Sequence, residues 1–197
     1  PRDVREMYDR GLKYLAETQS ENGDWRQGNN YSGPGVTGMA VMCFLASGED
    51  PNFGQYAGNI RRALRSMISQ QNDSTGYFGN SMYHHGFAML ALSEAYGAVD
   101  DRNLWPAGSE NKRSIGQSLE LAVRSAITSQ KQNSLGAWRY SPSGNDADTS
   151  VAGSVLVGLL AARNAGIEVP DASIDRAIAY FVSMTAPSGQ VAYAGGI

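Results

Sequence analysis

The sequence has 197 residues, of which 42% are hydrophobic and 18% charged, and its formal net charge is −3. This length fits one domain of ordinary size, and the scattered charges provide no basic field for a nucleic acid. No apolar run approaches the roughly 18 residues that a membrane span needs. The sequence therefore predicts a soluble chain without a transmembrane segment. Its polar start does not resemble a signal peptide, and the compartment stays open.

The first and most informative pattern along the chain is a repeat marked by glycine. An amphipathic stretch, a polar turn and a glycine followed two positions later by a larger residue occur four times. The four repeat glycines are Gly23, Gly76, Gly136 and Gly189, spaced by 53, 60 and 53 residues. A period of this size is typical of stacked helical hairpins, because one hairpin cannot bury its own apolar face.

Two kinds of segment alternate between these turns. Residues 4–18 carry apolar side chains on one helical face and charges on the other, whereas residues 37–45 are apolar nearly all round. Residues 85–92 and 152–160 repeat the apolar type, and no strand signal of comparable length occurs. The sequence therefore predicts an all-α fold in two layers, with amphipathic outer helices and buried inner helices.

Small residues and a polar insertion complete the predicted hairpins. Glycines within the apolar segments should let the inner helices approach closely. These glycines are Gly38, Gly86, Gly153 and Gly158. The polar residues 98–114 interrupt the helical pattern and predict an inserted loop.

The domain organisation follows from the repeat. We expect one domain over residues 1–197, with repeats at about 1–50, 51–100, 113–170 and 171–197. That is three hairpins and the outer half of a fourth, which is an incomplete ring.

The first repeat carries a motif with a known counterpart. Arg10-Gly11, Tyr14-Leu15, Gln19, Gly23 and Trp25 form RG-x2-YL-x3-Q-x3-G-x-W, and later copies keep parts of it. The pattern resembles the QW repeat of squalene-hopene and oxidosqualene cyclases. The chain is thereby identified as a member of the terpenoid cyclase and protein prenyltransferase superfamily, most similar to bacterial prenyltransferase and squalene-oxidase repeat proteins. The resemblance implies an α/α toroid, part of a longer one, with an apolar cavity for an isoprenoid.

The motif residues themselves have a structural interpretation. A Gln at the end of an outer helix can donate to free carbonyls there, while its oxygen accepts from the start of the next helix. The aromatic residue then packs between repeats. We assign this stapling role to Gln19, Trp25, Gln71, Phe78, Gln130 and Trp138.

Asp146 and Asp148 are the candidate catalytic residues. Squalene-hopene cyclases have Asp-x-Asp-Asp at a comparable place, and the resemblance implies Asp148 as a proton donor with Asp146 as its partner. This chain has Asp146-Ala147-Asp148-Thr149, which lacks the final Asp. The alternative is that Asp148 caps the N-terminus of a helix.

His85, Tyr83 and Tyr140 are the candidate ligand-binding residues, since they lie near the turns that precede inner helices. A buried, hydrogen-bonded state is the alternative for His85. No metal site is expected, because Val41 stands where the Asp-x-Cys zinc pair of protein prenyltransferases would place its Asp before Cys43. No nucleotide-binding motif occurs, and no cofactor is expected.

The leading functional hypothesis is a repeat domain that binds an isoprenoid or another apolar ligand on its inner helices. If it is an enzyme, the resemblance implies squalene-type cyclisation. The alternative is a non-catalytic scaffold for a protein or a glycan, which predicts polar groups on the concave face. Either further hairpins or self-association could cover the open end of the ring.

Overall fold

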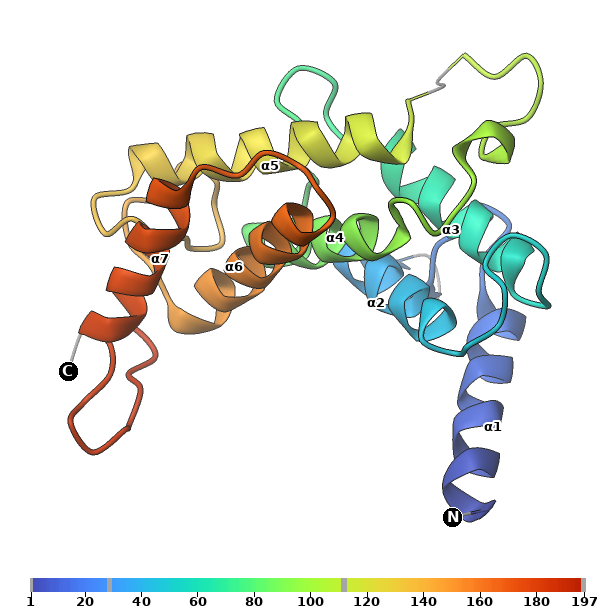
Figure 1. Ribbon diagram of the computed structural model, residues 1–197, viewed down its shortest axis with the longest axis horizontal. Coiled ribbons are helices and arrows are strands. Elements are labelled where there is room, and N and C mark those ends of the chain that lie inside the picture. Colours follow the sequence, from blue (N-terminus) through green and yellow to red (C-terminus); the bar gives the residue numbers. More distant parts are fainter. Residues whose placement is uncertain (1, 28–29, 111–112, 196–197) are drawn as a thin grey trace.

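The structure is a computed structural model that describes residues 2–27, 30–110 and 113–195. In this part of the chain it contains seven α-helices, one 3-10 helix and one two-stranded hairpin of β1 and β2 (Figure 1). The elements are α1 (Arg2–Thr18), β1 (Arg26–Gln27), β2 (Asn30–Tyr31), α2 (Pro34–Leu45), α3 (Ala57–Ser69), α4 (Met82–Ala95), η1 (Asp101–Asn103), α5 (Ile115–Gln132), α6 (Thr149–Asn164) and α7 (Asp171–Ser183). The predicted all-α class is confirmed.

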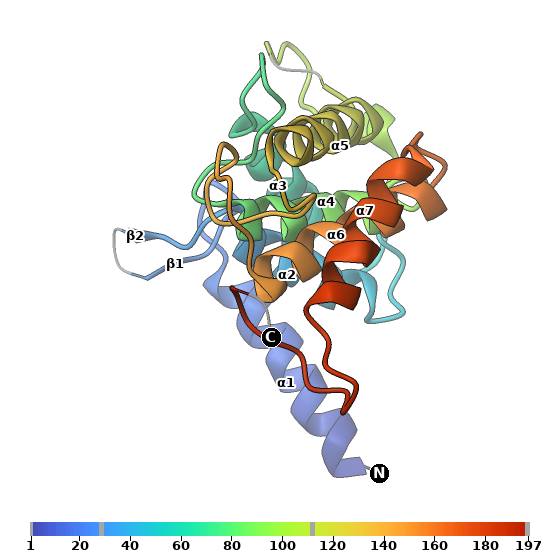
Figure 2. The same ribbon diagram turned by 90° about the vertical axis from the view of Figure 1, so that its left-hand side faces the viewer.

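The helices form an arch of two layers. Figure 1 shows α3 and α5 above α2, α4 and α6, with α1 and α7 descending at the two ends, and Figure 2 shows the same layers from the side. The alternation of outer helices (α1, α3, α5, α7) with inner helices (α2, α4, α6) follows the alternation of amphipathic and apolar segments. Among the described helices, none is both long and apolar enough to cross a lipid bilayer.

Small residues let the inner helices pack closely, as predicted for three of the four glycines. A Cβ added to Gly86 would lie 2.7 Å from the Ser154 carbonyl oxygen, and one added to Gly158 would lie 2.8 Å from that of Gly86. Gly38 approaches α4 in the same way. Gly153 was expected to do so too, but that prediction is wrong: its nearest neighbour is the Phe181 ring on α7, at 3.8 Å.

The described residues of the connection from α4 to α5, 98–110 and 113–114, pack against the rest of the chain. Leu104 is fully buried, and the Trp105 indole N–H donates to the Arg113 carbonyl at 2.8 Å. The guanidinium of Arg65 on α3 donates to the Leu104 carbonyl at 2.9 Å. The insertion therefore covers part of the outer face of α3.

The Gln71 side chain fastens the end of α3 to the start of α5. Its amide donates to the Gly76 carbonyl in its own turn and to the Ser118 carbonyl on α5, each at 2.9 Å. Its oxygen accepts from the Ser118 hydroxyl at 2.6 Å and from the Arg113 guanidinium at 2.9 Å. All four hydrogen-bonding positions of this buried amide are filled, and we call this arrangement the glutamine staple.

The same staple recurs at the neighbouring turns. The Gln19 amide donates to the Gly23 and Asn59 carbonyls at 2.9 and 3.0 Å, and the Gln130 amide donates to the Gly136 and Ser173 carbonyls at 2.8 Å each. The oxygens of Gln19 and Gln71 differ from expectation, because they accept from side chains rather than from backbone N–H groups at the start of the next helix. The oxygen of Gln19 accepts from the side chains of Asn59 and Arg62, whereas that of Gln130 is buried without a partner.

The turn glycine and the aromatic residue complete each staple. Gly23 has a φ of +86°, and a Cβ there would lie 2.2 Å from the Arg62 carbonyl oxygen, so only glycine lets this turn rest on α3. The Trp25 and Trp138 indoles donate back to carbonyls of their own outer helices, at 3.1 and 2.9 Å, and Phe78 is fully buried. At the fourth turn, no described atom lies within 4 Å of a Cβ at Gly189.

We expect Gln71→Ala to lower the free energy of unfolding by about 2–4 kcal/mol, because it leaves buried partners of a four-bond staple unsatisfied. Gln70→Ala is the matched control, since the side chain of the exposed Gln70 bonds to Ser66 of its own helix and to no other described residue. Urea unfolding monitored by circular dichroism measures both variants. An equal loss in the two would mean that the staple does not hold the hairpins together.

Candidate functional site

The predicted site residues meet where residues 139–148 cross the N-terminal ends of α4 and α6. The Tyr140 carbonyl accepts from the backbone N–H of Met82, the first residue of α4, at 2.8 Å. The Tyr193 carbonyl accepts from that of Thr149, the first residue of α6, at 2.9 Å. Equivalent turns therefore cap successive inner helices, and this fixes the backbone from which both tyrosines project.

Asp148 is the N-cap of α6. One carboxylate oxygen accepts from the Val151 N–H at 2.8 Å, and the other lies 3.2 Å from Nε of Arg139 in an ion pair. Asp146 is exposed and pairs with the same guanidinium at 2.9 Å. Asp148 itself is completely buried. The geometry is that of the capping alternative, and a role of Asp148 as a proton donor stays a prediction.

The half-buried Arg139 and the exposed Tyr140, Asp146 and Tyr193 form a surface cluster that we call the tyrosine rim. The two tyrosine hydroxyls are 3.0 Å apart, and 47% and 54% of Tyr140 and Tyr193 are exposed. The guanidinium carbon of Arg139 lies 5.7 Å from the centre of the Tyr140 ring. The hydrogen bond with Tyr140 is the main cause that raises the pKa of Tyr193 to about 12, so the Tyr193 hydroxyl stays protonated at neutral pH.

His85 lies beneath this rim and is wholly buried. Its Nδ1 accepts from the Phe78 N–H at 3.0 Å, which places the proton on Nε2, and Nε2 donates to the Ala122 carbonyl at 2.9 Å. Burial lowers its pKa to about 4, and its ring stacks on Tyr77 with centres 5.5 Å apart. His85 is thus in the buried, hydrogen-bonded state that was its alternative, with its two nitrogens bonded to the turn after α3 and to α5. Contact of His85 with a ligand stays a prediction.

Tyr83 is half-buried and turns toward the other candidate surface. Its ring packs on Phe87, with centres 5.2 Å apart, on the side of α4 that faces away from the outer layer. Neighbouring side chains on α2 and α6 occupy the same side of their helices. Together they form what we call the concave apolar face: Val36, Met39, Cys43, Tyr83, Phe87, Leu90, Leu156, Val157 and Leu160.

The concave apolar face is open in the described part of the chain. Val36, Met39 and Val157 expose 36%, 38% and 49% of their surfaces. A groove of about 440 Å³ runs between the C-terminal halves of α4 and α6, with Leu90, Val157 and Leu160 in its lining and Glu94 and Asn164 as polar members. Sequence reasoning missed this face, because helices that are apolar all round do not show which side lacks a neighbour.

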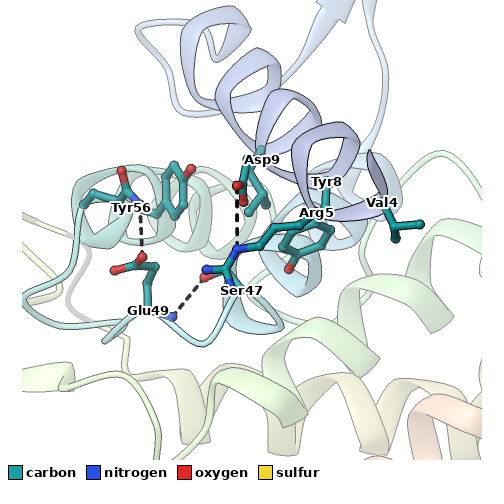
Figure 3. Close-up of a pocket in the computed structure, with 9 residues that line it drawn as sticks. Val4, Arg5, Tyr8, Asp9, Ser47, Glu49 and Tyr56 are labelled. Atoms are coloured by element: carbon teal, nitrogen blue, oxygen red, sulfur yellow. Dashed lines mark hydrogen bonds and ion pairs between the residues drawn. The ribbon is translucent and has the colours of Figure 1, made fainter. Parts of the chain in front are cut away.

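A second groove, of about 390 Å³, lies between α1 and the turn that joins α2 to α3 (Figure 3). Arg5 and Asp9 of α1 approach each other to 3.9 Å, and Glu49 accepts from the Gln55 amide at 3.1 Å. Burial, followed by the charges of Asp9 and Glu49, raises the pKa of Tyr56. The charged groups have partners within the groove, which therefore offers a ligand little uncommitted charge. Across the described residues, no three His, Cys, Asp or Glu side chains are placed to hold a metal ion.

The comparisons with known proteins define the family and the fold. A family profile, the domain of unknown function DUF6288, matches residues 5–195, and the chain belongs to this family. A solved structure named polysaccharide lyase BACCELL_00875 is similar in fold, with a TM-score of 0.65 at 13% sequence identity. The match covers 94% of this chain and 56% of that protein, so the chain spans about half of the neighbour's length. No curated protein matches the sequence.

The buried His85 should make the fold sensitive to mild acid. Because its pKa in the folded protein, about 4, lies below the ordinary 6.5, the unfolded chain takes up the proton first as the pH falls. This stability is complete above pH 6.5 and decreases toward pH 4 by about 3 kcal/mol in total. Urea unfolding between pH 7 and 4 measures it. The dependence of the unfolding free energy on pH should become weaker in His85→Gln and persist in His84→Asn. An unchanged pH dependence in His85→Gln would contradict the role given to His85.

Proposed function

We propose that this domain binds an apolar ligand on its concave apolar face, with an isoprenoid chain as the first class to test. The observation that carries the proposal is that three neighbouring inner helices each leave apolar side chains exposed or half-buried. Monomeric proteins seldom leave a large contiguous apolar patch in water, and such patches usually mark binding surfaces.

The energetic argument is one of area. Covering apolar surface contributes roughly 25 cal/mol per Å², so a linear apolar chain laid along such a band gains affinity without specific hydrogen bonds. The groove between α4 and α6 offers such a chain a defined path. Glu94 and Asn164 could orient a polar end group there.

The proposal is limited to binding. Cyclisation started by Asp148 would need a carboxyl group in contact with the ligand, whereas Asp148 is buried and caps α6. The concave face presents no other acidic side chain than Glu94 among the described residues of the three inner helices. A carrier or sensor of an apolar molecule fits this composition better than a cyclase.

The test is a fluorescence titration with dansyl-labelled farnesol. We expect saturable binding, weakened about tenfold in the double variant Met39→Gln/Val157→Gln, because two apolar contacts worth about 0.7 kcal/mol each are lost. Phe53→Gln is the matched control, since it removes a larger exposed apolar side chain outside the face. Absence of saturable binding, or equal weakening in the control, would overturn the proposal.

A second candidate function is saccharide binding at the tyrosine rim. The exposed Tyr140 and Tyr193 rings, next to the ion pair of Arg139 and Asp146, combine flat apolar surfaces with polar groups. The fold neighbour's name adds support for this class of ligand. This second proposal is that the domain is a scaffold that binds a saccharide.

Screening an array of oligosaccharides tests the second candidate. We expect any glycan that the domain retains to be lost in Tyr140→Ala/Tyr193→Ala and kept in Tyr14→Ala, which removes an exposed ring from α1. Farnesol binding should stay unchanged in the rim variant. An array without a retained glycan, or equal losses in both variants, would exclude the rim as a saccharide site.

A further inference from the structure

A groove of about 450 Å³ on the outer face of the arch differs in chemistry from the surfaces described above. It lies between the turn after α3, the outer side of α5 and residues 142–143. We call it the hydroxyl groove, because Ser and Thr side chains dominate its lining. Tyr77, packed on His85, forms part of one wall.

Two serines in the groove are buried but lack partners. Ser125 and Ser129 are only 8% and 6% exposed, and both line the groove from α5. Neither hydroxyl makes a hydrogen bond to any described residue. Because neither oxygen is sealed from solvent, both hydroxyls are open to an occupant of the groove.

Arg124 is the one charged residue among the described residues that line the groove. Its exposed guanidinium forms no ion pair or hydrogen bond with the described residues. Glu120, one helical turn earlier, lines a separate groove together with Lys131 and Glu168, and Arg124 stands on the ridge between the two. The hydroxyl groove therefore combines one uncommitted cation with several hydroxyl donors and no carboxylate.

The corresponding arginine of the preceding repeat is committed. Arg65 lies six positions before Gln71, as Arg124 lies six before Gln130, but Arg65 donates to the Leu104 carbonyl of the inserted segment. The third repeat has no such insertion over its outer helix. Arg124 therefore occupies the repeat position at which Arg65 bonds to the inserted segment, but no described residue plays the part of Leu104 for Arg124.

We infer that the hydroxyl groove binds an oxyanion, a carboxylate, sulfate or phosphate group, carried on a polyhydroxylated molecule such as an acidic sugar. Guanidinium groups bind such oxyanions through charge-assisted hydrogen bonds, and Ser125 and Ser129 would bond to the oxyanion or to neighbouring hydroxyls. This inference is independent of both the concave apolar face and the tyrosine rim.

The experiment is an NMR titration of the 15N-labelled chain with glucuronate, glucose 6-phosphate, glucose and inorganic phosphate. We expect either acidic sugar to shift the amides of residues 124–132 saturably and glucose not to do so. Tighter binding of glucuronate would indicate a carboxylate ligand, and tighter binding of glucose 6-phosphate would indicate a phosphate ligand. Inorganic phosphate binding as tightly as both sugars would indicate an adventitious ion only, and no saturable shift with any probe would overturn the inference.

Variants locate the binding within the groove. Arg124→Gln should weaken binding at least tenfold, because a hydrogen bond to a charged group is lost. Lys131→Gln, which removes one positive charge from the same helix outside the groove, should not. Ser129→Ala should weaken binding severalfold without changing the charge. Equal effects of Arg124→Gln and Lys131→Gln, or no effect of Ser129→Ala, would reduce the binding to general electrostatic attraction and overturn the site.

Discussion

The arch depends on one interaction, the glutamine staple that joins the end of each outer helix to a carbonyl near the start of the next. Because the donor turn and the receiving helix come from successive repeats, each staple fixes how two hairpins lie against each other. The inner helices can then pack through Gly38, Gly86 and Gly158, whose lack of a side chain requires a well-fixed spacing. The candidate surfaces are consequences of this framework, since they lie where inner helices have no neighbour or where turns cap them.

The framework was predictable because it is local and periodic. Three turns carry a Gln, a Gly and an aromatic residue two positions after the Gly, and a fourth turn keeps the Gly. This recurrence indicates stacked hairpins, and the alternation of amphipathic and apolar segments indicates two layers. Single residues were harder to place. Asp148 and His85 look chemically active in sequence, but their roles depend on burial and on partners such as Val151 and Ala122, which are set by packing. The direction in which Gly153 faces depends on the path of α7, which no local pattern encodes.

The candidate site was predictable in position but not in character. Residues that precede the inner helices do gather at the N-terminal ends of α4 and α6, where Tyr140 and Asp146 are exposed. The concave apolar face and the hydroxyl groove escaped prediction for opposite physical reasons. The first is built from helices whose uniform apolarity hides their open side, whereas the second is built from Ser and Thr residues that sequence alone cannot distinguish from an ordinary wet surface.

The unpartnered oxygen of Gln130 makes the third staple different from the first two. The first two staples use the amide oxygen as well as the amide hydrogens, whereas the third, which holds α7, uses the hydrogens alone. The junction between α5 and α7 is therefore held by fewer hydrogen bonds than the two junctions before it. Of the three stapled junctions, this is the one that should separate most easily under mild denaturation.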